Sequence, residues 1–205
     1  MSLTLYGAAR SRASMVRWYL EEKEIAYQWI SLDLGAGEHR QPAFLAINPF
    51  GKVPALVDDS LAGPDGQPLK LFESGAILQH LAEQHGQEFA GTGGAARRSL
   101  SLQWLLFANA SFGPALIQAA AKPEDLERQL TILDALLSAG PSLLGAAGSE
   151  TTAAGWGAAD CAIQSYLAYL PLFCPQVDLA PFPHVQASID ATRQRPAYQL
   201  AMGQG

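Results

Sequence analysis

Residues 48–56 have the sequence NPFGKVPAL, in which turn-forming residues precede a short apolar run. Asn48, Pro49 and Gly51 favour a turn, and the apolar residues 55–57 form the strand that follows it. Pro54 has no N–H to donate to a sheet, so the strand begins after it, and a cis bond before Pro54 would turn the Val53 backbone outward. Because most X-Pro bonds are trans, these residues alone favour an ordinary trans turn.

Strand and helix patterns alternate on both sides of this segment. Before it, a β-prone run, an amphipathic helix and an alternating run predict a βαβ unit, and a short helix follows. These elements are expected at residues 3–6, 11–23, 26–34 and 42–47. After it, strands at 55–57 and 69–72 flank a turn and are expected to pair antiparallel. Ser74 then favours the N-cap position of a helix that runs to about residue 85.

Strand signals nearly vanish after the glycine-rich residues 91–94. Helical patterns occupy 95–121, with an interruption at Gly113 and Pro114, then 123–137, 158–170, and a last helix from about 182 that ends before Pro196. The predicted fold class is therefore α/β followed by all-α, with an α/β domain over residues 1–86 and an all-helical domain over 94–205.

Composition excludes several classes of protein. Of the 205 residues, 49% are hydrophobic and 16% are charged, against roughly 25% charged in ordinary soluble domains, which excludes intrinsic disorder. The net charge of −6 lacks the basic footprint of phosphate-backbone binding, so we expect no nucleic-acid partner. We find neither a signal-peptide pattern nor roughly 18 uninterrupted apolar residues, so we expect a cytoplasmic protein without a membrane span.

Cysteine and histidine usage gives no metal signal. Cys161 and Cys174 form no CxxC pair, and the histidines at positions 39, 80, 85 and 184 show no metal-ligand spacing. We therefore expect neither a disulfide framework nor a metal site.

Several motifs, in this order, resemble the cytosolic glutathione transferases. They are residues 48–56, FESGAI at 72–77, Asp160 early in an apolar helix, FPHV at 182–185 and RPAY at 195–198. The resemblance covers nearly the whole chain and implies a thioredoxin-like βαβ-α-ββα domain followed by a helical domain. An atypical serine-type bacterial class, such as chi, is the nearest fit.

The resemblance implies a glutathione site around the opening segment. It implies a cis bond between Val53 and Pro54, with the Val53 main chain pairing with the cysteinyl backbone of glutathione. Glu73 and Ser74 stand where a strand gives way to a helix, whose N-terminal N–H groups and dipole suit the γ-glutamyl carboxylate. Glu73 can take the α-ammonium group. The alternative is that Ser74 only caps its helix.

The glycine carboxylate of glutathione requires a cation. Lys52 meets that need, and His39 and Arg40 are weaker candidates that equally fit a solvated loop. No cofactor is expected, because glutathione acts as a co-substrate.

The turn after the first strand is the place expected to stabilise the glutathione thiolate. Placed by Tyr6, Ser11 falls at the position of the active serine or cysteine of the family, where a hydroxyl, a helix dipole and Arg10 or Arg12 would lower the thiol pKa. Arg10, Arg12 or Ser14 are the alternatives to Ser11. Ser11 also fits an N-cap, and both roles coexist only if its proton points outward to sulfur.

The electrophile is expected between this turn and the first long helix of the helical domain. We name Ala9, Phe107 and Ser111 for that pocket, although an aromatic stripe at helical spacing also fits a core face. Asp160 is expected to cap its helix through the N–H of Gly157, which stands where the family has Ser or Thr, so only half of the capping box can form.

The expected activity is conjugation of reduced glutathione to small hydrophobic electrophiles, in a cytoplasmic homodimer engaged in detoxification. One alternative is a non-catalytic binding or assembly module, which the set of glutathione-recognition residues disfavours. The other is glutathione-dependent disulfide or peroxide reduction, which would favour a cysteine in place of Ser11.

Overall fold

A four-stranded mixed sheet forms the N-terminal half of the computed structural model, which describes residues 2–140, 142–144 and 156–202. The strands are β1 (Leu3–Gly7), β2 (Gln28–Ser31), β3 (Ala55–Ala62) and β4 (Pro68–Phe72), in the order β2-β1-β3-β4. β1 and β2 are parallel, and β3 is antiparallel to both β1 and β4. The predicted βαβ unit and the antiparallel pair are confirmed.

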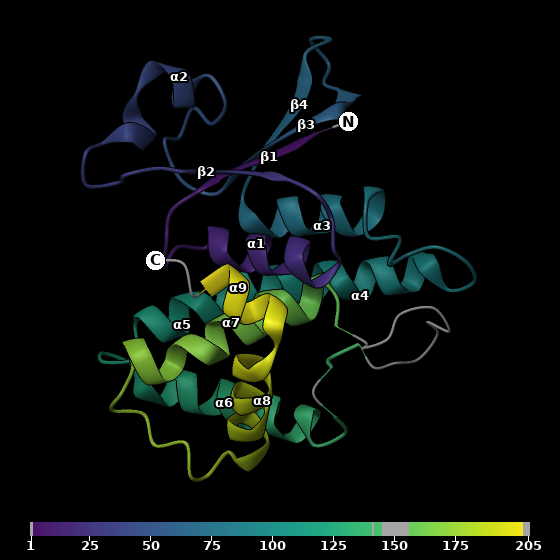
Figure 1. The fold of residues 1–205 in the computed structure, drawn as a ribbon. Helices are drawn as coiled ribbons and strands as arrows, with labels where there is room; N and C mark the ends of the chain where they lie inside the picture. Colours follow the sequence, from purple (N-terminus) through teal and green to yellow (C-terminus); the bar gives the residue numbers. More distant parts are fainter. Residues whose placement is uncertain (1, 141, 145–155, 203–205) are drawn as a thin grey trace.

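Helices α1 (Ala13–Glu22) and α3 (Ser74–Gln84) lie between the sheet and the helical half of the molecule (Figure 1). The 3-10 turn η1 (Glu38–Arg40) and the short helix α2 (Pro42–Leu45) lie away from that half. Residues 13–20 of α1 are all buried, because the sheet covers one side of this helix and α7 and α9 cover the other.

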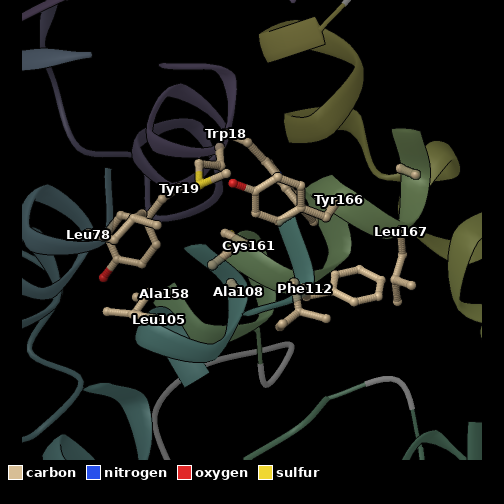
Figure 2. Packing of buried hydrophobic residues seen from close by; sticks show 14 of the residues in the cluster. Trp18, Tyr19, Leu78, Leu105, Ala108, Phe112, Ala158, Cys161, Tyr166 and Leu167 are labelled. Atoms are coloured by element: carbon tan, nitrogen blue, oxygen red, sulfur yellow. The ribbon is translucent and has the colours of Figure 1, made fainter. Parts of the chain in front are cut away.

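From Gly94 on, all the regular elements of the described residues are helices. The elements are α4 (Gly94–Phe107), the π turn η2 (Ala108–Phe112), α5 (Gly113–Ile117), α6 (Pro123–Leu137), α7 (Ala158–Phe173), α8 (Pro183–Gln194) and α9 (Pro196–Met202). The α/β and all-α halves share one hydrophobic core. Figure 2 shows Trp18 and Tyr19 of α1 packed among Leu105, Cys161 and Tyr166. The domain boundaries at residues 86 and 94 stay our prediction.

The interruption predicted at Gly113 and Pro114 takes a different form. The chain stays helical through both residues, and the irregularity is the π turn over Ala108–Phe112 that precedes them. Pro114 has no N–H for the carbonyl group of Ala110, so the backbone widens before the proline instead of stopping there.

The continuous helical stretch Gly94–Ile117 has the length and composition to cross a membrane, and 39% of its most apolar window is buried inside the protein. The sequence still holds no 18 uninterrupted apolar residues there, because polar residues such as Gln103 and Asn109 interrupt the run without adding charge. Core helices pass the same test, so length and composition alone assign no membrane.

A helix that the sequence did not predict follows the last predicted one. The last predicted helix ends before Pro196, as expected, and α9 then begins at Pro196 and packs on α1. The rings of Trp18 and Tyr198 pack edge to face, with their centroids 5.1 Å apart. Arg195, between the two helices, pairs with Glu22 of α1 and lies 4.5 Å from the Trp156 ring centroid. The C-terminal residues thus tie the helical half to the sheet half.

The start of α7 has the predicted half of a capping box, made by Asp160, and a second contact made by Glu88. Asp160 accepts a hydrogen bond from the Gly157 N–H at 3.0 Å, as expected. The Ala158 N–H donates to the Glu88 carboxylate at 3.2 and 3.3 Å. A Cβ at residue 157 would lie 2.6 Å from that carboxylate. Glu88, 70 residues away in sequence, therefore accepts the first N–H of α7, at a helix start where Gly157 has no side chain to offer an acceptor.

Candidate functional site

The sheet register brings three loop segments to one end of the sheet. Tyr6 of β1 is paired with Ala55 of β3, and Ala55 is paired with Phe72 of β4. β1 and β4 therefore end where β3 begins. The turn after Gly7, the Val53-Pro54 bond and the Glu73–Ser74 junction consequently meet at this end, as the glutathione-site hypothesis requires.

The Val53-Pro54 peptide bond is cis. The trans turn that the residues alone favoured is therefore wrong, and the cis bond implied by the family resemblance is confirmed. Buried Asn48 holds this segment: its Nδ2 donates to the carbonyl oxygen of Lys52 at 2.6 Å, and its Oδ1 accepts the N–H of Phe50 at 3.1 Å. This role of Asn48 was missed, although its place in the turn motif was a signal.

The 3-10 turn η1 packs beside the same segment. Gly51 has φ +59°, and a Cβ there would lie 3.0 Å from the carbonyl oxygen of His39. Glycine thus permits both the backbone conformation and the close approach. This contact brings His39 and Arg40 to the neighbourhood of Lys52. Arg40 and Lys52 are exposed and His39 is partly buried.

Glu73 and Ser74 connect β4 to α3 in an unusual backbone conformation. Glu73 has φ +70° and ψ 117°, a region rarely occupied by residues with a side chain, and such strain concentrates at functional sites. Glu73, not Ser74, occupies the N-cap position, and no side chain caps the helix. The alternative in which Ser74 only caps α3 is therefore wrong, because the turn at Glu73 makes Ser74 the first helical residue.

The Ser74 hydroxyl instead reaches the helical half. It hydrogen-bonds to Oδ1 of Asn109 at 3.3 Å, and the Tyr166 hydroxyl donates to the same Oδ1 at 2.9 Å. A Cβ on Gly75 would lie 2.9 Å from the Asn109 Nδ2, and one on Gly113 would lie 2.9 Å from the Tyr166 ring. Both glycines therefore permit this bridge. Asn109 and Tyr166 were missed, and an amide in an apolar helix was the only sequence signal.

Ser11 makes both of its hydrogen bonds within the turn after β1. Its hydroxyl donates to the carbonyl oxygen of Ala8 at 2.7 Å and accepts the Ala13 N–H at 3.2 Å. The hydroxyl proton of Ser11 therefore points into the turn and not outward. In this orientation Ser11 caps the helix and cannot also donate a hydrogen bond to a thiolate. Arg10, next to Ser11, has φ +56° and an exposed side chain.

The two arginines of this turn act on different tyrosines of α7. The Arg12 guanidinium lies 5.9 Å from the Tyr166 ring centroid. Burial raises the pKa of Tyr166, which Arg12 opposes and Glu73 reinforces. Burial also raises the pKa of Tyr169, which Ser14 and Arg10 oppose. The turn therefore faces α7, with two neutral phenols beside Arg10 and Arg12.

The three residues named for the electrophile pocket are not grouped together by any described cavity. Ala9 is exposed, and Phe107 packs against Trp104 and Phe112 at centroid distances of 5.6 and 6.1 Å. Ser111 lines a cavity of about 290 Å³ whose polar lining includes Lys122, Asp125, Arg128 and Gln129 and contains neither Ala9 nor Phe107. Phe107 thus contributes to an aromatic cluster, as the alternative interpretation expected.

Both cysteines are free and buried. Burial raises the pKa of the Cys161 thiol well above its ordinary range, and it raises that of Cys174 as well. Neither thiol is therefore suited to act as a thiolate nucleophile.

Residues 1–83 match the family described as "Glutathione S-transferase, N-terminal domain". Among curated relatives, the "Disulfide-bond oxidoreductase YfcG" of Escherichia coli is 42% identical over 116 residues, which cover 57% of this chain and 53% of that protein. A glutathione S-transferase of Silene vulgaris is 42% identical over 93 residues, or 45% of this chain and 39% of that protein. The matched chain thus spans about half of these relatives' length or less.

A solved structure extends the likeness to the helical half. The glutathione transferase of Burkholderia graminis, with two glutathione molecules bound per subunit, is 26% identical, covers 99% of this chain and 88% of its own, and has a TM-score of 0.81. The match of residues 1–83 to the family's N-terminal domain, the partial matches to curated relatives and this likeness over nearly the whole chain all agree with the motifs and the fold.

Proposed function

We propose that this protein is a glutathione transferase. The observation that carries the proposal is the convergence, through the Tyr6–Ala55–Phe72 register, of the turn after β1, the cis Val53-Pro54 bond and the Glu73–Ser74 junction. The solved relative from Burkholderia graminis binds glutathione, and the same fold here supports the same ligand. The class within the family stays a prediction.

Glutathione is proposed to lie across these three segments. The main chain of Val53 pairs with the cysteinyl backbone, and the cis bond to Pro54 presents that main chain. The N-terminus of α3 and Ser74 take the γ-glutamyl carboxylate, whose charge the helix dipole favours. The exposed Glu73 carboxylate takes the α-ammonium group. Lys52 takes the glycine carboxylate, with Arg40 and His39 beside it.

The turn holding Ser11 is proposed to stabilise the thiolate. The thiol proton leaves to solvent, and the sulfur attacks an electrophilic carbon; with an aryl halide a C–S bond forms and the C–halogen bond breaks. For Ser11 to donate to sulfur, its hydroxyl proton must turn away from the Ala8 carbonyl. Arg12 and Arg10 supply positive charge at the same turn, which favours the thiolate.

The electrophile is proposed to bind beside Ala9, where the turn faces the helical half. Tyr166 and Tyr169 of α7 lie next to Arg12 and Arg10, so these phenols join Ala9 as candidate contacts. Phe107 and Ser111 are weaker candidates for contact with the electrophile, because Phe107 lies in an aromatic cluster and Ser111 lines the polar cavity. Small apolar electrophiles suit a site between aromatic rings.

Retention on immobilised glutathione, followed by conjugation of an aryl halide and of an isothiocyanate, tests the proposal. We expect specific elution with free glutathione and turnover of at least one electrophile. Absence of retention would remove glutathione as the ligand. Retention without turnover of either electrophile would instead support the non-catalytic binding module.

A second activity is favoured by the match to the disulfide-bond oxidoreductase of Escherichia coli. In that reaction two glutathione molecules would be oxidised to glutathione disulfide while one substrate disulfide is reduced to two thiols. The buried Cys161 and Cys174 offer no accessible thiol, so both thiols would come from glutathione. Reduction of hydroxyethyl disulfide in the presence of glutathione, measured beside aryl halide conjugation, separates the two activities.

We propose a homodimer that works in cytoplasmic detoxification. Phe50 is 69% exposed and meets the exposed ring of Phe72 at 5.2 Å, and Leu106 on α4 is 59% exposed. Large exposed apolar side chains of this kind favour a partner surface. Size-exclusion chromatography with light scattering is expected to give twice the chain mass, and Phe50→Ser is expected to shift the protein toward monomer. A monomeric wild type contradicts this part.

A further inference from the structure

Two histidines and a buried aspartate meet at the end of the sheet opposite the candidate glutathione site. Asp58 of β3 is paired with Leu3, the first residue of β1, whereas the glutathione segments lie beyond Tyr6. His80 is on α3, and His85 follows that helix directly. Along α3, His80 lies about 9 Å from Ser74. The cluster is therefore separate from the residues proposed to bind glutathione.

Both imidazole rings point the same nitrogen at one carboxylate oxygen. Nε2 of His80 lies 2.9 Å from Asp58 Oδ2, and Nε2 of His85 lies 2.7 Å from the same atom. The two ring centroids are 5.8 Å apart. The three potential ligand atoms all lie within 4.8 Å of one another. The two rings hydrogen-bond to this oxygen, and three potential ligand atoms so close together can share one cation after a small separation.

The aspartate is buried and held in one orientation. Asp58 is 1% exposed. Ser60 donates to its Oδ1 through both its N–H and its hydroxyl at 2.8 and 2.5 Å. The carboxylate is thus oriented with Oδ2 toward the histidines.

We propose that Asp58, His80 and His85 form a binding site for a borderline transition-metal cation, with Zn²⁺ as the reference ion. Imidazole nitrogen and carboxylate oxygen are ligands of Zn²⁺, and three protein ligands leave a fourth position for water. Sequence reasoning did not predict the site, because the two histidines have a zinc-like spacing of four intervening residues but no accompanying cysteine pair, and Asp58 is distant in the sequence.

Side-chain adjustments convert the cluster into a coordination site. Tetrahedral Zn²⁺ ligands at about 2.0–2.1 Å from the metal lie roughly 3.3 Å from one another. The Nε2–Oδ2 separations therefore need to open by about half an ångström, and the two Nε2 atoms, now within 4.8 Å of each other, need to lie about 3.3 Å apart. The side chains of His80 and His85 are 11% and 21% exposed, which gives an ion access from solvent. On binding, each neutral ring carries its proton on Nδ1.

A metal here would join the C-terminal end of α3 to β3. These two elements otherwise meet through apolar packing, including Ile77 and Leu81. A cation that binds only the folded protein stabilises it according to its concentration relative to Kd. The expected consequence is therefore a thermal stability that depends on metal concentration.

Titration of untagged, chelator-treated protein with ZnCl₂ tests the site by calorimetry, with CoCl₂ as a visible-absorbance probe. We expect saturable one-to-one binding, a rise of several degrees in Tm, and shifts of the Nε2 resonances of His80 and His85 in long-range ¹H–¹⁵N spectra. His80→Gln and His85→Gln are each expected to weaken binding at least tenfold, while the exposed His184→Gln serves as the matched control and leaves it unchanged.

Glutamine keeps an amide that can donate to Asp58, so these variants are expected to fold. Circular dichroism and Tm in chelator check that they do. The proposal is overturned if the wild type shows no saturable binding, or if the His80→Gln/His85→Gln variant binds Zn²⁺ as tightly as the wild type. Since the readouts use metal alone without glutathione, either result is independent of the proposed transferase activity.

Discussion

The hydroxyl of Ser11 donates a hydrogen bond to the carbonyl oxygen of Ala8 at 2.7 Å. Any catalytic role of Ser11 requires this hydrogen bond to break, because the same proton cannot be donated to the carbonyl and to a sulfur anion at once. A thiolate is the stronger acceptor, since hydrogen bonds to charged groups exceed those to neutral ones. Glutathione binding is therefore expected to redirect this hydroxyl.

Ser11→Ala is expected to lower kcat/KM for aryl halide conjugation by about tenfold to a hundredfold, the loss of one hydrogen bond to a charged group. The pKa of the bound glutathione thiol, followed by thiolate absorbance, is expected to rise in parallel. Ser11→Thr keeps a hydroxyl and is the control. Unchanged thiol ionisation in Ser11→Ala would transfer the role to an arginine, Ser14 or a backbone donor.

Arg12→Gln is expected to reduce conjugation more than Arg10→Gln. Arg12 is partly buried and held against the Tyr166 ring, whereas Arg10 is exposed, and a charge acts more strongly where solvent screens it less. Paired measurements of kcat/KM and of bound-thiol pKa, at low and high salt, compare the two variants. An equal or larger effect of Arg10→Gln contradicts this ordering.

Ser74→Ala is expected to raise the Kd for glutathione about tenfold, because the γ-glutamyl carboxylate loses a hydrogen-bond donor. Isothermal titration calorimetry measures the change, and Ser99→Ala on the exposed face of α4 is the matched control. The Asn109→Ala variant, which removes the acceptor of Ser74 and Tyr166, is expected to alter glutathione affinity as well. If Ser74→Ala binds as the wild type does, Ser74 serves only the contact between the two halves.

Glu88→Ala is expected to lower the free energy of unfolding by about 1–2 kcal/mol, because the Ala158 N–H loses its acceptor at the start of α7. Gly157→Ser alone is also expected to destabilise, since its Cβ meets the Glu88 carboxylate. In the double variant the new serine can cap the helix, so the two losses should not add. Denaturant unfolding of the cycle measures the coupling, with Glu127→Ala as control. If the losses of unfolding free energy in the two single variants simply add in the double variant, a serine cap at residue 157 does not replace the Glu88 contact.

Asp160 is expected to make stability fall as pH rises from about 4 to 6. Burial raises its pKa from 3.8 to about 6, and hydrogen bonds from Gly157, Leu143 and Ser142 only partly oppose this. The folded protein therefore binds more protons than the unfolded chain in this window. The stability of the wild type relative to Asp160→Asn should decline by about 3 kcal/mol across it and level off above. A difference that is constant with pH contradicts the shifted pKa.

Local sequence patterns were sufficient for the order of elements and for most of the glutathione segments. The alternating and helical periodicities predicted the sheet strands and the helices of the second half except α9, because burial of one face imposes those periods. The NPFGKVPAL and FESGAI motifs located Val53, Pro54, Glu73 and Ser74. Ser74 was assigned the wrong local role, since the cap preference of serine does not include the positive φ of Glu73.

Contacts between distant residues could not be predicted in the same way. Ser74 and Tyr166 share Asn109 across 35 and 57 positions. Glu88 caps a helix 70 positions away, and Asp58 meets His80 and His85 across 22 and 27. Periodicity reports which face of an element is buried but not which side chain of another element covers it, so no local signal marked these partners.

The sequence by itself determined that the chain forms an α/β half and a helical half, that its motifs resemble those of the glutathione transferases, and that Asp160 makes half of a cap. The tertiary structure alone decided where the Ser11 proton points, what compensates for Gly157, and that two histidines converge on Asp58. The physical reason is that turn, cap and periodicity preferences act over a few residues, whereas hydrogen-bond partners in a packed interior are chosen by the docking of whole elements.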